Sequence, residues 1–250
     1  MDLTDVPLHR LSLISGATFI TAVINLPQKF QVVNKVSPVG AGWRMLPLML
    51  SIAVAAGVAG YIIQRLKIPP LYLFLVAGVL QTIGLALTGT LSGVGMRFSS
   101  VQYAFEVIMG LGMGLGLSTL IVALPTIVES ADGGTSLHFG CLEMLLTIPA
   151  VTMGALGQAR VLGGSIGVAI ATNILNHRVR SGTHAIPPNV IKEILASTRA
   201  IDKLDKALQQ AVRHTFAKGY DQQFQMLAGL GGATILLSCL MFERKPRRMQ

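Results

Sequence analysis

The stretch "GQARVLGGSIGVAIATNILN" (residues 157–176) is apolar, small or merely polar throughout, except for Arg160 near its beginning. A helix of about 20 such residues is long enough to cross the hydrocarbon core of a bilayer. An unpaired arginine at the bilayer centre costs at least about 2.5 kcal/mol, although near a helix end it reaches the headgroups. The stretch therefore predicts a membrane helix in which Arg160 either extends to the cytoplasmic headgroups or points into a helix bundle, toward carbonyl groups or a carboxylate.

The composition of the whole chain is that of a membrane protein. Of its 250 residues 52% are hydrophobic and 12% charged, against about 25% charged in a soluble domain. The mean hydropathy is +0.62. The formal net charge is +9, but the basic residues lie between apolar runs or at the C-terminal end, as charges that set membrane topology do. No basic stripe with interleaved aromatic residues occurs, which excludes a nucleic-acid-binding protein.

Apolar windows of spanning length predict an all-α, polytopic membrane protein with about six transmembrane helices. In the first part of the chain, residues 1–176, five spans are expected, at about 11–33, 43–63, 71–89, 103–128 and 152–175. The piece just before the fifth span, residues 133–149, is expected to be interfacial or re-entrant, or else a plain helical extension. A last span and a basic cytoplasmic tail occupy residues 226–250.

The long connection over residues 177–225 differs from the spans because charges separate its apolar residues. Val190, Ile194, Ile201, Leu204, Leu208 and Val212 recur at helical spacing. This pattern predicts an amphipathic helix outside the membrane, which starts after Pro187 and Pro188 and stops at Gly219. Six spans would place the turn with Arg65 and Lys67 on the same side as the basic tail, and that side is expected to be cytoplasmic.

Signals of an enzyme or a metalloprotein are absent from the sequence. The run "GLGMGLG" (residues 110–116) lacks the glycine spacing and the preceding strand of a dinucleotide-binding loop. Its overlapping G-x-x-x-G pairs, and the pair Gly163 and Gly167, instead favour close helix packing in a membrane. The histidines lie at or outside span ends, and Cys141 and Cys239 form no metal or disulfide pattern. We therefore expect a non-enzymatic protein without cofactor or metal.

Polar side chains inside membrane helices usually face a bundle interior or a water-filled path. The candidates from the residues alone are Asn25, Gln28, Gln31, Gln81, Gln158, Arg160 and Asn173. Asn25, Gln28 and Gln31 follow one another in steps of three, which lets them share a helix face. The alternative for each amide is a hydrogen bond that bridges two helices.

Three stretches carry a resemblance to a known family. "PQKFQVVNKVSPVGAGWRMLP" (residues 27–47), "KIPPLYLFLVAGVLQTIGLAL" (67–87) and "GALGQARVLGGSIGVAIATNILN" (154–176) resemble the C-terminal half of fungal major facilitator superfamily transporters, of the fourteen-helix drug:proton antiporter branch. The most specific parts are the R-x-x-G-G-x-I-G string from Arg160 and the P-x-x-x-Q and S-P-x-x-A-G pattern from Pro27 to Gly42.

The resemblance implies one half-bundle of a major facilitator fold with a substrate cavity at the interface with a second half. The family's cavity-side or packing motifs match Pro27, Gln31, Arg160, Gly163, Gly164 and Gly167. Arg160 would start the penultimate family helix at its cytoplasmic side, and the glycines after it would let that helix pack closely. The chain lacks a counterpart of the family's N-terminal half, and residues 133–149 look like an insertion; both features suggest a truncated form.

The implied function is export of small molecules such as drugs or secondary metabolites in exchange for protons, in a multi-pass protein of the plasma membrane. Its partners would be the lipid bilayer, a small-molecule substrate, protons, and a second copy of the chain or the missing N-terminal half. Because half of the pocket is absent, the chain would be inactive alone. The alternative is a structural or regulatory membrane protein that pairs with another membrane subunit through its G-x-x-x-G faces.

Overall fold

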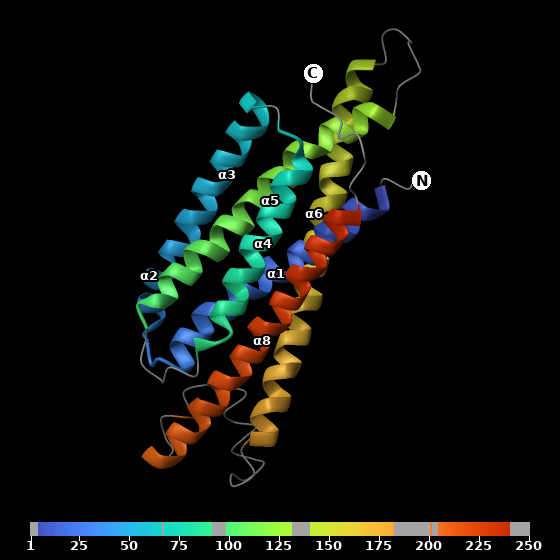
Figure 1. Ribbon diagram of the computed structural model, residues 1–250. Helices are drawn as coiled ribbons and strands as arrows, with labels where there is room; N and C mark the ends of the chain where they lie inside the picture. Colours follow the sequence, from blue (N-terminus) through green and yellow to red (C-terminus); the bar gives the residue numbers. More distant parts are fainter. Residues whose placement is uncertain are drawn as a thin grey trace.

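The computed structural model describes residues 5–66, 68–91, 99–131, 141–182, 201 and 205–240. Within these residues the regular structure is helical and no strand occurs, which confirms the all-α prediction. The helices are α1 (Asp5–Val32), α2 (Pro38–Arg44), α3 (Leu46–Leu66), α4 (Pro70–Thr88), α5 (Val101–Ala131), α6 (Cys141–Gly182) and α8 (Lys206–Leu240). Figure 1 shows the long helices lying side by side in one bundle.

The long helices run alternately up and down through the bundle. α1 packs against α6 and α8, α4 packs against α5 and α8, and α3 packs at the edge against α5 (Figure 1). The described ends of α1 and α8, at the beginning and the end of the chain, lie toward the same end of the bundle as the end of α3 (Figure 1). This arrangement agrees with an even number of membrane crossings.

Three helical stretches are long and apolar enough to cross a membrane, among the residues that the structure describes: Arg10–Val32, Pro38–Ile63 and Val101–Ile121. Tyr72–Thr88 is a shorter apolar helix. These four stretches overlap the first four spans expected from the sequence. The expected span at 152–175 lies within α6, and the last expected span, as far as the structure describes it, lies within α8 up to Leu240; the two helices pack in the same bundle.

The sixth helix differs from the expected short span. α6 is continuous from Cys141 to Gly182, so it is about 63 Å long, roughly twice the hydrocarbon thickness. The re-entrant interpretation of residues 133–149 is wrong for the part after residue 140, where Pro149 lies inside the helix; residues 133–140 lie outside the described residues. Arg160 therefore lies near the middle of this helix and does not start it.

The connection over residues 177–225 also differs from the expectation, because both of its ends continue membrane helices. α6 extends to Gly182, and α8 begins at Lys206 and continues through Gly219 to Leu240. Gly219 does not stop the helix; a Cβ there would lie 2.6 Å from the Leu175 side chain, so the glycine serves packing against α6. Val190, Ile194 and Leu204, expected on the apolar face of a surface helix, lie outside the described residues.

A buried cluster joins these extensions to the end of α1. Val212, Phe216 and Tyr220 of α8 pack with Val179 of α6 and with Ile201. Arg213 is buried beside them and donates a hydrogen bond to the Val32 carbonyl oxygen. Of the apolar residues of the expected amphipathic segment that the structure describes, Ile201 and Val212 are therefore used for packing between helices, whereas Leu208 is exposed.

The glycine pairs of α5 pack as the sequence predicted. A Cβ on Gly110 would lie 2.8 Å from the Leu48 carbonyl oxygen of α3. A Cβ on Gly114 would lie 2.8 Å from the Ala55 Cβ of the same helix. A Cβ on Gly112 would lie 2.8 Å from the Ala77 carbonyl oxygen of α4. The two overlapping G-x-x-x-G patterns thus serve two different neighbours, which lets α5 lie close to both α3 and α4.

Candidate functional site

The seam between α1 and α6 contains Arg160. Its guanidinium lies over the ring of Phe19, 4.8 Å from the centroid, and its side chain is half-buried. A Cβ on Gly16 would overlap the Arg160 carbonyl group, so a glycine is required at that point of α1. The Arg160 side chain therefore does not lie free at a helix end, and no carboxylate of the described residues pairs with it. It stacks on an aromatic ring, where a cation is attracted by the π electrons.

The glycines after Arg160 bring the two helices together. A Cβ on Gly163 would overlap the carbonyl group of Leu13, and one on Gly164 would collide with the Ile20 side chain. A Cβ on Gly167 would lie 2.6 Å from the Thr21 hydroxyl oxygen. These glycines therefore line the α1 contact, and they serve helix packing.

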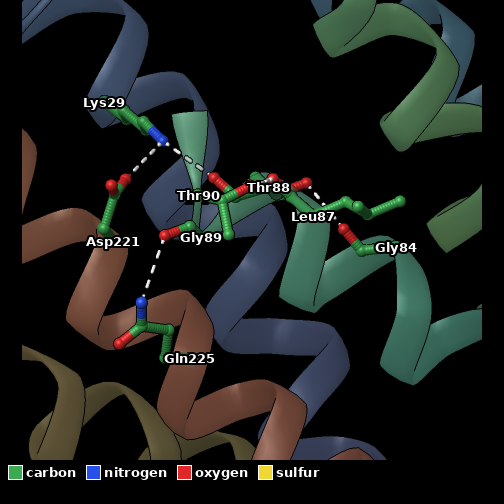
Figure 2. A network of polar contacts seen from close by, with 8 residues as sticks. All are labelled: Lys29, Gly84, Leu87, Thr88, Gly89, Thr90, Asp221 and Gln225. Carbon is green, nitrogen blue, oxygen red and sulfur yellow. Dashed lines mark hydrogen bonds and ion pairs between the residues drawn. The ribbon is translucent and has the colours of Figure 1, made fainter. Parts of the chain in front are cut away.

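A buried ion pair joins α1 to α8 and α4. The Lys29 Nζ lies 3.1 Å from Asp221 Oδ1 and donates a second hydrogen bond, of 3.2 Å, to the Thr88 carbonyl oxygen. Figure 2 shows the ammonium between these two oxygens. It also lies 5.3 Å from the centroid of the Phe224 ring. A buried ammonium is costly unless its donors are satisfied, and here a carboxylate, a carbonyl and a ring face surround it.

The C-terminal end of α4 supplies the backbone carbonyl group that binds Lys29. Thr88 is the last residue of α4, and its carbonyl has no acceptor role within the helix, so a cation there is favoured by the helix dipole. The next carbonyl, of Gly89, accepts a hydrogen bond of 3.4 Å from Gln225 Nε2 (Figure 2). A Cβ on Gly89 would lie 3.2 Å from the Asp221 carbonyl oxygen, so α8 passes close to this end.

A second polar contact joins α4 to α1 in the interior. Gln81 is buried, and its Nε2 donates to the Thr18 hydroxyl oxygen at 2.5 Å. The Thr18 hydroxyl in turn donates to the carbonyl oxygens of Ile14 and Ser15. Gln81 is thus an interhelical bridge, the alternative that the sequence left open for each amide.

The remaining amide candidates do not converge on one site. Asn25 is buried, but Gln28 is exposed and Gln31 is half-buried. The three follow one side of α1 within an arc of about 120°, and their unequal exposure shows that this arc runs from the buried to the exposed side of the helix. Pro27 lies inside α1 and is half-buried.

On α6 the two flanking amides face outward. Gln158 and Asn173 are exposed, and the Asn173 Nδ2 donates to the Ala169 carbonyl oxygen of its own helix at 3.0 Å. In the described bundle neither lies in a closed cavity. The outer face of α6 that carries Asn173 is also apolar; its exposed residues include Val161, Leu162, Ile166 and Ile170.

An open, mostly apolar groove with a volume of about 610 Å³ runs between α5 on one side and the end of α2 and the first half of α3 on the other. Trp43, Leu50 and Val54 line one wall, and Tyr103, Val107 and Leu111 line the other. None of the candidate residues chosen from the sequence lines this groove. Among the described residues, no three His, Cys, Asp or Glu side chains gather where they could hold a metal ion.

The sequence interpretation missed two charged residues of the interior. Asp221 was assigned to the extramembrane connection, but it is 7% exposed and pairs with Lys29. Glu106 lies in an apolar window and is fully buried, with 0% exposure. A search for single carboxylates within the apolar windows would have found Glu106. No local signal would have found Asp221, because its partner is far away in the sequence.

Curated relatives of the chain are fungal transporters. It is 37% identical over 235 residues to the MFS-type transporter FPY5 of Fusarium mangiferae. The aligned region is 94% of this chain and 36% of that transporter. It is 29% identical over 191 residues to the MFS acetylaranotin efflux transporter ataA of Aspergillus terreus, covering 75% of this chain and 38% of the relative. It is 28% identical over 233 residues to the efflux pump mokI of Monascus pilosus, and the aligned region is 91% of this chain and 39% of that pump. No family model matches the chain.

The chain thus spans between 36% and 39% of the length of these relatives. The resemblance to fungal major facilitator transporters is confirmed over 94% of this chain. The relatives and the apolar helices together make it a multi-pass membrane protein. Because the relatives are transporters and efflux pumps, the comparisons point to a protein that is not an enzyme.

Proposed function

We propose that this homologue of the fungal major facilitator transporters is one half-bundle of an efflux pump, which exports small molecules such as drugs or secondary metabolites in exchange for protons across the plasma membrane. The observation that carries the proposal is the 37% identity to an MFS-type transporter over 94% of the chain. The antiparallel bundle of long apolar helices supports it, because half-bundles of this kind move against each other in alternating access.

A second half-bundle completes the transport path in this proposal. Transport by alternating access needs two half-bundles with a substrate site at their interface. The exposed apolar faces of α3 and α6, with Leu50 and Val54 on one and Leu162 and Ile166 on the other, are available to lipid or to such a partner. The partner is a second copy of the chain or the other part of a longer polypeptide.

Two measurements test the proposal together. The first is the size of the native protein in carbonate-washed membranes, detected with an antibody to the C-terminal tail. If the band lies near 26.5 kDa, the second measurement uses this chain. If the band is larger, the second measurement uses the longer polypeptide. The second is proton-gradient-driven movement of the dye ethidium in vesicles that contain that protein. Movement that collapses with the gradient supports a pump; a well-inserted protein without flux supports the structural or regulatory subunit instead.

Arg160 is the residue of the seam whose substitution should affect transport most. Arg160→Ala removes the guanidinium from the Phe19 ring and is expected to abolish the flux of ethidium, because a cation is lost from the α1 and α6 contact. Arg180→Ala, at the exposed end of the same helix, serves as the matched control and should transport normally. Unchanged flux in Arg160→Ala at normal membrane levels would remove Arg160 from the mechanism.

A further inference from the structure

Glu106 is a carboxylic acid inside the half-bundle whose only recorded side-chain partner among the described residues is a neutral amide, Gln102, one turn earlier on α5. It lies in the apolar stretch Val101–Ile121 of α5 and is 0% exposed. No cation of the described residues forms an ion pair with its carboxyl group, and its oxygens make no close, well-aligned hydrogen bond. Gln102, Glu106, Met109 and Met113 are all buried and follow helical spacing, so Glu106 lies on the inward face of α5. A group of this kind inside a membrane bundle is a functional residue by default.

The packing of α5 fixes the level of Glu106 in the bundle. One turn further along α5, a Cβ on Gly110 would lie 2.8 Å from the Leu48 carbonyl oxygen. On the other neighbour, a Cβ on Gly84 would lie 2.6 Å from Met109. Since α3 runs parallel to α5 and α4 runs antiparallel, Glu106 lies near the level of the α2 end and of Thr88. This is the end of the bundle where Lys29 binds the Thr88 carbonyl.

The charged groups on the helices around Glu106 are few. On α1 the lysine at this level, Lys29, is paired with Asp221 of α8. Arg44, at the end of α2, is the other cation at this level, and Tyr103 lies one turn before Glu106 on α5 itself. The described titratable side chains of α3 and α4 lie at the opposite end; they are Tyr61, Arg65 and Tyr72. On α6, Arg160 stacks on Phe19, while His177, Arg178 and Arg180 belong to its C-terminal part.

The surroundings of Glu106 select the kind of ligand that it binds. The groove between α3 and α5 is lined by Tyr103 and Val107, and Glu106 is not part of its wall. A metal ion would need further ligands of the kind that the described residues do not gather. An organic substrate would need space next to the carboxyl group, which is fully buried. A proton needs no space, and it removes the charge whose burial without a partner is costly.

We propose that Glu106 is a proton-binding site of this half-bundle, which holds a proton in the packing seen here and releases it when the bundle opens to water. This proposal rests on the proposed transport function and adds a proton site to it. An O–H bond forms when the carboxylate takes a proton from water on one side, and the same bond breaks when the proton leaves to the other side. The buried amide of Gln102, one turn earlier on α5, interacts with the carboxyl group and can stabilise the carboxylate after release.

Infrared spectroscopy of the full chain in lipid nanodiscs tests proton binding without any substrate. The wild-type protein should show the carbonyl stretch of a buried, protonated carboxylic acid near neutral pH, and Glu106→Gln should lack that band. Asp205→Asn, at an exposed carboxylate in front of α8, is the matched control and should keep it. Persistence of the whole band in Glu106→Gln, or its absence from the wild type, would overturn the proton site. Equal thermal unfolding of the three proteins checks that they are folded.

Transport then tests whether the proton site is coupled to flux. With ethidium as the probe, Glu106→Gln should lose accumulation driven by a proton gradient and keep exchange of dye between the two sides, while Glu106→Asp should restore part of the accumulation. Gradient-driven accumulation that survives in Glu106→Gln would overturn the coupling role. A complete lack of dye movement in the wild type would overturn the proposed transport function instead, and the infrared comparison would still decide the proton site.

Discussion

At position 29 of α1 a lysine is buried inside the bundle, and the structure explains how this is tolerated. The ammonium meets Asp221, the Thr88 carbonyl and the ring of Phe224 at the same time. Asp221 and Phe224 belong to α8, and the carbonyl belongs to the end of α4. A buried charge that is satisfied in this way ties α1, α4 and α8 into one arrangement, because any sliding of one helix would leave an ion without its partner.

Breaking this pair from one side should be costly. Lys29→Met leaves the Asp221 carboxylate buried without its lysine and is expected to lower the free energy of unfolding by about 3–5 kcal/mol. The double variant Lys29→Met with Asp221→Leu should recover most of that loss, because an apolar pair of similar volume needs no ionic partner. Unfolding in mixed micelles measures both values.

The double variant also tells a stabilising pair from a functional one. If it unfolds like the wild type but moves no ethidium, the ions are required for transport as well as for stability. A single variant as stable as the wild type would contradict the role given to the buried pair.

At the scale of the elements, close approach of helices depends on residues without side chains. On α6, Gly163 faces a carbonyl group of α1, whereas Gly154 and Gly157 face open space. All three look alike in the sequence. The spacing of Gly163 and Gly167 predicted a packing face on α6, but only the position of α1 shows which glycines lie on it.

Substitution of these glycines should therefore have unequal effects. Gly163→Leu forces α1 and α6 apart and is expected to lower the free energy of unfolding by about 1–3 kcal/mol or more, through overpacking. Gly157→Leu, on the same helix with nothing within 4 Å of its Cβ, should be neutral or slightly stabilising because leucine is the better helix former. Thermal unfolding of the two purified variants makes the comparison, and equal losses in both would contradict the packing seen here.

At the scale of the whole molecule, the alternation of helices fixes which turns share a side of the membrane. The end of α4 and the start of α8 lie at one end of the bundle, and the beginning of α1 lies toward the other (Figure 1). Thr90 follows the end of α4, Lys206 is the first residue of α8, and Arg10 lies near the beginning of α1. The basic residue Arg65 closes α3 at the Arg10 end. The expectation from the sequence that Arg65 and the basic tail are cytoplasmic places the Arg10 end on the cytoplasmic side, although the end of α6 and the start of α8, at the opposite end, also carry Arg178, Arg180 and Lys206.

Cysteine labelling tests this topology. In a background where Cys141 and Cys239 are replaced by serine, Thr90→Cys and Lys206→Cys should react with a membrane-impermeant maleimide on intact cells. Arg10→Cys should react only after the membrane is permeabilised, because its end of the bundle faces the cytoplasm. Reaction of all three positions under the same condition would refute the alternation of helices.

The sequence by itself determined the class of the protein, most of its spans and its packing residues. Hydropathy over about 20 residues and the spacing of small residues are local properties, and they suffice for helices in a membrane, where each helix satisfies its own backbone. The motif residues around Pro27 and Arg160 likewise determined its resemblance to fungal transporters.

Only the tertiary structure decided what the polar residues do. Arg160 stacks on Phe19, Gln81 bridges to Thr18, and Lys29 pairs with a residue that the sequence placed outside the membrane. The continuous course of α6 and the early start of α8 were also decided there, because the long helices are stabilised by packing against one another. These outcomes depend on which distant segments meet, and burial of a charge or an amide is permitted only where such a partner arrives.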